Sequence, residues 1–449
     1  MGNPFKFLDK YLISPRTNNL RGMHQQKKIR PAVVLTILLI YCGIFQLLAA
    51  GQLSYYFANL SADSTDNVLL VDKASQALLV LNSNSPGTIQ VLDTFRITTG
   101  KLTGDKEKEG DFKTPEGIYE IRSLIQGQQL STKYGPMAFT LNYPNFVDQL
   151  KGRNGSNIWI HGRDEEIIDR QTKGCISLEN GNLLQLSQYI QLQKTQVIII
   201  DSLNHQDCRA DSEKFGMVDA LIHHWLKAWE EGDSDTYASL YSTQFTTQSW
   251  RQLADYLQYK KLLDNSYIWK KIEAEKIWLL QSDSEAHIQF QQNYLCPVFY
   301  TEGTKQLIFI WADSTWKIAT EYFTATTPRY SVETSIRAFL ESWKRDWETG
   351  DIEHFIQHYD STFSAPDHAH LADYYQYKKK VFDKNPKIEV KISDIKISSS
   401  EPLEWLVTFT QDYIATNYHD HGEKTLLISG HPKEPKSFKI QKETWNAIR

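Results

Sequence analysis

The sequence predicts a multidomain protein: a membrane-spanning helix, a mostly β domain, and two tandem α+β domains. Three observations support this. A long apolar run follows a basic N-terminal segment, short strand-like runs fill residues 67–201, and one pattern occurs twice in the C-terminal half. At 449 residues the chain is too long for one ordinary core, and roughly three domains of 100–200 residues are expected.

Residues 1–30 form a basic head, followed by the uncharged run "PAVVLTILLIYCGIFQLLAA" at Pro31–Ala50. Twenty helical residues rise about 30 Å, which matches the hydrocarbon thickness of a bilayer, so we place an anchor at residues 31–52. A buried core helix and a cleaved signal peptide are the alternatives, and the length of the head and of the run favours an uncleaved anchor. The positive-inside rule then keeps the head in the cytoplasm and places the remaining domains across the inner membrane, in the periplasm.

The net charge is −5 although the head is basic, so the rest of the chain is acidic. This balance argues against nucleic acid as a main partner. Of the four cysteines, Cys42 lies in the predicted span, and Cys175, Cys208 and Cys296 follow it. This odd number leaves at least one thiol unpaired, and a bridge between Cys208 and Cys296 stays open because sequence does not give its geometry.

Residues 67–201 contain "NVLLVDKASQALLVLN", "TIQVLDTFRITTG" and "GIYEIRS", which are short apolar or alternating runs separated by turn residues. Such runs predict strands. A helix is expected in "LENGNLLQLSQYIQ", and the strand "TQVIIID" closes the domain. Residues 202–216 are polar and lack apolar periodicity, so we predict a linker there.

Residues 217–325 and 332–445 are two copies of one domain. "WLKAWEEGDSDTYASLYSTQF" matches "WKRDWETGDIEHFIQHYDSTF" at an offset of 118 residues, and "LADYLQYKK" matches "LADYYQYKK" at the same offset. Helices come first and alternating segments follow, which indicates an α+β unit with a curved antiparallel sheet. The copies show no paired acid and base at equivalent positions.

Eleven of the twelve tryptophans lie in these copies, where their helical and strand spacing favours core positions over a binding platform. The basic "QYKKK" is expected to be a solvated helix face, and the charged "TGDKEKEGD" at 103–111 a solvated turn or a flap over a cleft. "HHW" at 223, "HAH" at 368 and "HDH" at 419 lack a matching cysteine or carboxylate cluster. We therefore expect no metal and no cofactor.

One histidine and one cysteine stand out in "NIWIHGRDEEIIDRQTKGCISLEN", residues 157–180. We expect His161 and Cys175 at two strand ends that face a common edge. An imidazole that takes the thiol proton makes the sulfur a nucleophile toward an amide carbonyl. Gly174 would leave backbone amides free to stabilise an oxyanion, and Lys173 with Arg163 would lower the thiol pKa or hold a substrate carboxylate. The alternative is a small core cysteine and a structural histidine.

The segments "RITTGKLTGDKEKEGDFKTPEGIYEI", "YGPMAFTLNYPN", "IWIHGRD" and "TKGCISL" resemble, in this order, the YkuD-type L,D-transpeptidase catalytic domain. The resemblance covers residues 67–201 and implies a β-sandwich. It also implies that Cys175 is the acylated nucleophile and His161 its general base. The carbonyl of Gly162 would orient the imidazole, and the amides around Gly174 and Cys175 would bind the oxyanion.

Thr172 matches the Ser/Thr position of the family signature, whereas two other positions depart from it. Lys173 stands where the family usually has a second histidine, and Ser177 where it usually has arginine or asparagine. The gap from His161 to Cys175 is also short for the signature. These departures put recognition of the acyl acceptor in doubt.

The duplicated units resemble the nuclear-transport-factor or SnoaL-like cone fold, and the whole arrangement resembles cell-shape L,D-carboxypeptidases. The YkuD-type resemblance implies acyl transfer on peptidoglycan tetrapeptide stems, and the likeness to the carboxypeptidases lends weight to hydrolysis. Of the two outcomes, we place transpeptidation ahead of carboxypeptidation. The other class of function is an inactive wall-binding adaptor. The cones would bind an envelope protein or peptide.

Overall fold

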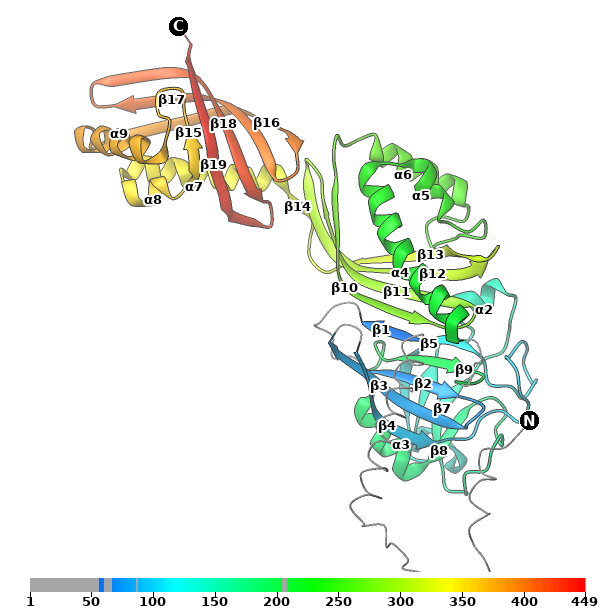
Figure 1. Ribbon diagram of the computed structural model, residues 1–449. Helices are drawn as coiled ribbons and strands as arrows, with labels where there is room; N and C mark the ends of the chain where they lie inside the picture. Colours follow the sequence, from blue (N-terminus) through cyan, green and yellow to red (C-terminus); the bar gives the residue numbers. More distant parts are fainter. Residues whose placement is uncertain (1–55, 60–66, 86–87, 204–207, 449) are drawn as a thin grey trace, which may run out of the picture. The chain divides into compact units, whose positions relative to one another are not determined.

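The computed structural model describes residues 56–59, 67–85, 88–203 and 208–448 (Figure 1). The chain divides into two units, and the first, Met1–Ala49, lies outside the described residues. The predicted basic head and the anchor at 31–52 also lie outside them. In the described part of the chain, no helix is both long and apolar enough to cross a membrane.

The mostly β domain predicted for residues 67–201 is present. Its strands are β2 (Val68–Asp72), β3 (Ala77–Ser85), β4 (Thr88–Arg96), β5 (Gly117–Gln126), β6 (Met137–Leu141), β7 (Trp159–Arg163), β8 (Ile176–Glu179) and β9 (Gln196–Ile200). Its helices are α2 (Phe146–Leu150) and α3 (Asn180–Leu186), with the short 3-10 helices η2 (Gly127–Gln129), η3 (Thr132–Tyr134) and η4 (Ser187–Tyr189). Helix α3 is the predicted one. Helix α2 was not predicted, because its five residues show no period and only its capping box, Asn145 with Asp148, marks it.

The eight strands follow one path, β4-β3-β2-β9-β5-β6-β7-β8, instead of forming two separate sheets. Strand β5 pairs with β9 through residues 117–120 and with β6 through residues 121–126, so the two halves of the path are continuous through this strand. The ends of the path meet where Thr98 and Ser177 exchange backbone hydrogen bonds of 2.8 and 2.9 Å. Buried residues of both halves, such as Val71, Ile160 and Ile176, share one core, as a sandwich requires.

The first cone begins with a helix that is longer than predicted. Its elements are α4 (Cys208–Glu231), α5 (Ser234–Ser239), α6 (Leu253–Asp264), β10 (Lys271–Gln281), β11 (Glu285–Leu295), β12 (Phe299–Ala312) and β13 (Thr315–Ala325). The predicted linker at 202–216 is therefore wrong from Cys208 onward. That stretch lacks an apolar period but contains helix-favouring residues such as Ala210, Glu213 and Lys214.

Strands β10 to β13 form an antiparallel sheet in chain order, and β1 (Phe57–Asn59) adds to it beside β10. Strand β14 (Tyr330–Ser331) pairs with β12 and leads into the second cone. Cys296 is a buried free thiol in this cone. The bridge to Cys208 that the sequence left open is therefore not formed by Cys296.

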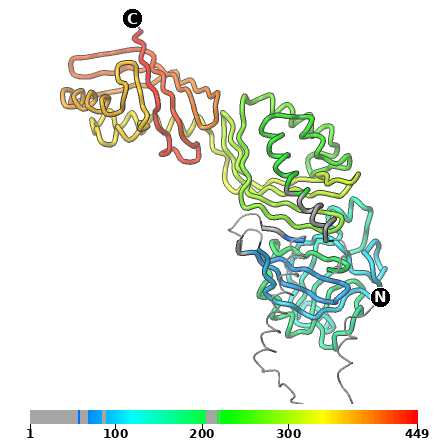
Figure 2. Tube along the Cα trace, in the orientation of Figure 1, coloured from blue at the N-terminus to red at the C-terminus, as the bar shows by residue number. Residues whose placement is uncertain are grey.

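The second cone repeats this order, which Figure 2 lets the reader follow from yellow to red. Its elements are α7 (Val332–Thr349), α8 (Ile352–Ile356), β15 (Tyr359–Ser364), α9 (Leu371–Lys384), β16 (Ile388–Glu401), β17 (Glu404–Ala415), β18 (Tyr418–His431) and β19 (Glu434–Ala447). The sheet order is β15-β19-β18-β17-β16, with the helices on one face (Figure 1). The α+β prediction is confirmed for both copies.

Tryptophans fill the two cone cores as predicted. Trp225 and Trp343, which are equivalent at the offset of 118, are fully buried and donate to Tyr241 and Tyr359 at 2.9 and 3.0 Å. The prediction for "QYKKK" was wrong at one residue: Lys378 is 6% exposed, and its neighbours on the helix are solvated.

Paired acids and bases also lie inside both cones, contrary to the sequence interpretation. Lys305 pairs with Glu321 at 2.7 Å, and Lys424 pairs with Glu443 at 2.6 Å. Each pair joins two consecutive strands of its sheet, β12 with β13 and β18 with β19. A residue pattern within one segment does not show them.

Candidate active site

Strands β7 and β8 bring the predicted histidine and cysteine onto one face of the sheet. The strands are parallel, with Ile160 opposite Ile176 and His161 opposite Ser177. Cys175 directly precedes β8 and lies beside Trp159. Because side chains alternate along strands and neighbours face the same side, Cys175 and His161 share a face. His161 is in the middle of β7 and not at its end as expected, because the strand continues through Gly162 and Arg163.

The imidazole of His161 is held in one orientation by its neighbours. Its Nδ1 lies 2.8 Å from the carbonyl oxygen of Gly162, the contact expected from the sequence. A carbonyl can only accept, so Nδ1 carries the proton and Nε2 is left as an acceptor. The ring of Tyr134 packs edge-on against the imidazole, with centroids 4.9 Å apart and planes at 88°.

Burial lowers the pKa of His161, which is 7% exposed. The hydrogen bond to Gly162 raises this pKa, whereas the positive charges of Arg163 and Lys133 lower it further. The net direction is downward, so the imidazole is neutral at pH 7. A neutral imidazole with a free Nε2 can accept a proton.

The sulfur of Cys175 contacts the start of β7. The thiol donates to the carbonyl of Asn157 at 3.4 Å, and the backbone N–H of Trp159 donates to the sulfur. Burial raises the pKa of Cys175, and the contributions of Trp159, Lys106 and Lys133 that lower it are smaller. The resting thiol is therefore protonated at neutral pH.

The expectation that Lys173 and Arg163 lower the thiol pKa is wrong. Lys173 is exposed, and the lysines whose charges act on the sulfur are Lys106 and Lys133. Arg163 forms an ion pair with Glu165. The charges adjacent in sequence therefore differ from the charges adjacent in space.

Gly174 and Thr172 shape the turn that precedes the cysteine. Gly174 has a φ of +135°, and a Cβ there would lie 2.8 Å from the backbone oxygen of Lys113. Glycine is thus required both by the conformation and by the space. The hydroxyl of Thr172 donates to the Cys175 carbonyl at 2.6 Å and accepts from the Gly174 amide at 3.1 Å. The Gly174 amide is therefore already used, which removes it from the predicted oxyanion donors.

Ser177 stands where the family signature usually has arginine or asparagine, and it is buried. Its hydroxyl lies 3.5 Å from Nδ1 of His161. Its backbone makes the bridge to Thr98 that joins the two ends of the strand path. The small side chain fits this closed position beneath the imidazole.

The loop flagged as charged, residues 103–111, is neither wholly solvated nor loosely held. Lys106 is 3% exposed and pairs with Asp111 at 2.7 Å. Asp111 also accepts hydrogen bonds from the backbone amides of Glu107, Lys108 and Lys113. Burial would raise the pKa of Asp111, but these hydrogen bonds outweigh it and lower the pKa to about 2.

Sequence reasoning missed four residues that surround the two predicted side chains: Lys106, Lys133, Tyr134 and Asn157. They come from loops whose course shows no periodic signal. Lys106 and Tyr134 lie in segments that carried the family resemblance, whereas Lys133 and Asn157 lie just outside them. Over the described part of the chain, no group of three or more histidine, cysteine, aspartate or glutamate side chains is arranged to hold a metal ion.

Fold and site together define a domain from a family of cysteine-dependent, peptidoglycan-modifying enzymes. The family model for the L,D-transpeptidase catalytic domain, YkuD, matches residues 66–199. The model for the Cds6 C-terminal NTF2-like domain matches residues 217–322 and 335–444, once per cone. The chain thus carries an L,D-transpeptidase catalytic domain followed by two NTF2-like domains, and both predicted resemblances are confirmed.

The chain is similar to several particular proteins. The putative L,D-transpeptidase YafK from Escherichia coli is 32% identical over 104 residues, which are 22% of this chain and 38% of that protein. The structure of Bd1075 from Bdellovibrio bacteriovorus is 26% identical, covers 61% of this chain and 98% of that one, and has a TM-score of 0.55. The helical cell shape determining protein Pgp2 from Campylobacter jejuni is 28% identical with the same coverage and a TM-score of 0.46.

Proposed function

We propose that the protein is an L,D-transpeptidase that acts on peptidoglycan tetrapeptide stems through a thioester on Cys175. The observation that carries the proposal is the hydrogen bond between His161 Nδ1 and the Gly162 carbonyl. It leaves Nε2 as a base on the strand face that also presents Cys175. The family assignment of residues 66–199 supports the substrate class.

In the proposed reaction, His161 Nε2 takes the thiol proton while the sulfur attacks the amide carbonyl carbon of an L-centre. The C–N bond to the following D-residue then breaks, and the imidazolium returns the proton to the leaving amine. The resting pair is neutral, since burial raises the pKa of the thiol and lowers that of the imidazole. Proton transfer therefore accompanies the attack and does not precede it.

In the second step the nitrogen of an acceptor amine attacks the thioester carbonyl carbon while His161 Nε2 removes a proton from it. The C–S bond then breaks, and the imidazolium returns the proton to the sulfur of Cys175. With the Gly174 amide used by Thr172, the backbone amide of Cys175 is the proposed donor to the oxyanion. Lys106 and Lys133 supply positive charge near the sulfur. Either charge also suits a carboxylate of the stem peptide.

Hydrolysis of the same thioester would make the protein an L,D-carboxypeptidase that trims tetrapeptide to tripeptide. One experiment separates these outcomes. The full chain in detergent is incubated with disaccharide tetrapeptide, and the products are resolved by mass spectrometry. We expect cross-linked dimer and released D-alanine, and neither with Cys175→Ala. Tripeptide alone would assign the carboxypeptidase activity, and unchanged substrate would overturn both.

Acylation of Cys175 by a carbapenem distinguishes an enzyme from an inactive wall-binding adaptor. A carbapenem should add covalently to Cys175 of the full chain at one equivalent, and the adduct should be absent in Cys175→Ala. Without an adduct on the wild-type chain, the adaptor function replaces the enzyme.

We also propose that residues 31–52 anchor the protein in the inner membrane, with both enzymatic and NTF2-like domains in the periplasm. The basic head and uncharged run support this arrangement. Protease added to spheroplasts should digest the C-terminal domains and leave the head intact. Digestion of the head with protection of the C-terminal domains would show the reverse orientation, and protection of the whole chain would contradict the proposed anchor topology.

A further inference from the structure

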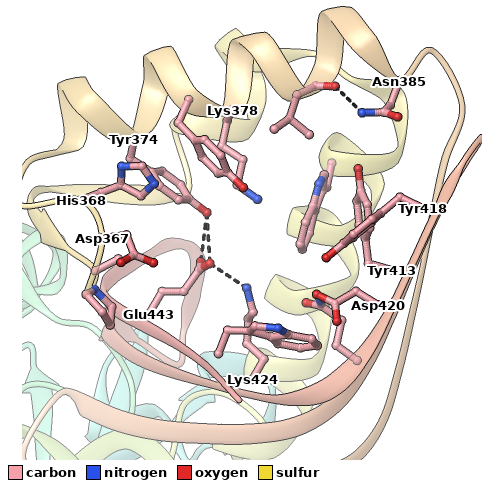
Figure 3. Close-up of a pocket in the computed structure, with 17 residues that line it drawn as sticks. Asp367, His368, Tyr374, Lys378, Asn385, Tyr413, Tyr418, Asp420, Lys424 and Glu443 are labelled. Atoms are coloured by element: carbon pink, nitrogen blue, oxygen red, sulfur yellow. Dashed lines mark hydrogen bonds and ion pairs between the residues drawn. The ribbon is translucent and has the colours of Figure 1, made fainter. Parts of the chain in front are cut away.

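The second cone contains a cavity of about 660 Å³ (Figure 3). Helix α9 contributes Tyr374 and Lys378 on one side, and the strands contribute Glu443 and Lys424 on the other. Further aromatic rings line it: Trp347, Tyr377, Tyr413, Tyr418 and Trp445. A cavity of this size with aromatic walls and a few polar groups is typical of small-molecule sites.

The charges at the bottom of the cavity do not balance. Glu443 accepts from Lys424 at 2.6 Å, and from the hydroxyls of Tyr359 and Tyr374 at 3.1 Å. The ammonium of Lys378 is buried and lies 4.0 Å above the ring of Trp347, without an acceptor among the described residues. The bottom of the cavity therefore holds two lysines and one carboxylate. The carboxylate of Glu443 is paired with Lys424, and Lys378 is left without an ion-pair partner among the residues described there.

Three polar atoms of lining residues also lack a partner among the described residues: the indole N–H of Trp347, the hydroxyl of Tyr413 and the amide oxygen of Gln411. Because these three atoms are enclosed, the ammonium of Lys378 remains the group that would meet an acceptor oxygen of a ligand. Asp367 and Asp420 lie at the rim, where they disfavour a second negative charge on the ligand.

The first cone keeps the ionic group but carries larger rings at cavity positions. Lys260, equivalent to Lys378 at the offset of 118, lies 3.6 Å above Trp229. His368 and Asn385 line the cavity in the second cone, whereas the equivalent residues of the first are Trp250 and Tyr267. Trp250 stacks on Tyr259 at 5.0 Å, and Tyr267 packs against Phe299 at 5.9 Å.

We propose that the second cone binds a planar aromatic monocarboxylate, with the carboxylate on Lys378 and the apolar body between the aromatic walls, and that the first cone does not. This site lies outside the catalytic domain and is independent of the proposed peptidoglycan chemistry. The same residue types in the first cone serve as a built-in comparison. There the lysine is accompanied by the larger rings of Trp250 and Tyr267.

Protonation should couple to this binding. Burial lowers the pKa of Lys378 to about 7, with Glu443 raising it and Lys424 lowering it further. The other titratable groups around the cavity are Asp367, His368, Tyr374, Tyr377, Tyr413, Tyr418 and Asp420. A carboxylate favours the ammonium form, so affinity should fall as pH rises from 6.5 to 8.5.

The test is calorimetric titration of the full chain in detergent with 2-naphthoate at pH 6.5. We expect one site per chain, weakened about 10- to 100-fold by Lys378→Met, as for loss of a charge-assisted hydrogen bond. Lys260→Met in the first cone is the matched control and should bind with unchanged affinity. The neutral 2-naphthamide and 2,6-naphthalenedicarboxylate should each bind at least 10-fold more weakly than 2-naphthoate.

A second variant keeps the proposal testable if Lys378→Met fails to fold. Asn385→Tyr places the ring of the first cone in the cavity without removing a charge, and it should abolish binding. Equal affinity for the amide, equal loss in Lys260→Met, full binding by Asn385→Tyr, or tighter binding of a disaccharide tripeptide than of 2-naphthoate would each overturn the proposal. Carbapenem acylation of Cys175 is unaffected by these variants, so a failed cavity and a failed enzyme are distinguished.

Discussion

At the scale of single residues, the partner of the imidazole decides how the proposed site works. His161 points Nδ1 at a neutral backbone carbonyl, not at a carboxylate. A carboxylate would stabilise the imidazolium strongly, whereas a carbonyl sets the tautomer with a smaller rise in pKa. Burial then dominates, and the imidazole is neutral before the reaction starts.

This electrostatic state predicts how Cys175 reacts with iodoacetamide. Burial raises the pKa of the thiol, so the thiolate fraction and the alkylation rate should increase from pH 6 to pH 10 without an acidic plateau. Rates are measured by mass spectrometry of the full chain. Fast alkylation below pH 7 that is lost in His161→Gln would instead show a preformed thiolate–imidazolium pair.

Tyr134 is predicted to position the imidazole through its ring. Tyr134→Leu removes the edge-on contact and should lower the rate of carbapenem acylation by about 10- to 100-fold, the effect of misplacing a catalytic group. Tyr134→Phe keeps the ring and should retain the wild-type rate. A normal rate in Tyr134→Leu, or a loss in Tyr134→Phe, would contradict a role based on the ring contact.

At the scale of elements, strands could be predicted and their partners could not. The apolar run at β9 and the alternation at β7 are visible within a few residues. That β7 pairs with β8, and that Thr98 bridges to Ser177, depends on contacts between distant segments. His161 and Cys175 were found from residue type and family resemblance. Lys106 and Asn157 lie on loops, where no period marks which side chain faces the sulfur.

The loop at 103–111 is predicted to depend on one carboxylate. Asp111→Asn removes the ion pair with the buried Lys106 and should cost about 2 kcal/mol of stability, while the exposed Glu109→Gln should cost almost none. The folded pKa is lowered to about 2, so the contribution of Asp111 is present above pH 4 and lost as pH falls toward 2. Urea unfolding monitored at pH 7 and pH 3 measures both effects. Equal losses in the two variants would contradict the assignment.

At the scale of the whole molecule, the two cones share a buried ionic group and differ in the space around it. Lys378 was mistaken for a solvated residue because its segment is rich in charge, and helix amphipathicity does not reveal a lysine that faces Glu443 on a distant strand. The fold class of each copy was visible in the order of its elements. The cavity was not, because the residues that line it come from segments that lie far apart in the sequence.

Both buried lysines predict a rise of cone stability with pH. Burial lowers each pKa to about 7, while a lysine in the unfolded chain stays protonated to about pH 10. The unfolded state therefore binds more protons between these values, and stability increases by up to about 1.4 kcal/mol per pH unit for each lysine.

Denaturant unfolding of the full chain between pH 6.5 and pH 9 measures this slope. Lys260→Met and Lys378→Met should each lower this slope by the amount that corresponds to about one proton bound on unfolding. Lys379→Met changes an exposed neighbour and should leave the slope unchanged. A slope that is flat in the wild-type chain, or unchanged in both buried-site variants, would contradict the prediction.

The position of β9 has a consequence for how the enzyme domain is made. This strand is the last of its domain in sequence, yet it lies between β2 and β5 and joins the half of the sheet built first to the half that carries His161 and Cys175. The two halves of the sheet cannot pair through β9 before residue 200 has left the ribosome. In the proposed topology, residue 200 must also have passed through the translocon. A nascent or truncated chain that stops short of it should therefore be unable to react with a carbapenem, although both reactive side chains are already in place along the polypeptide.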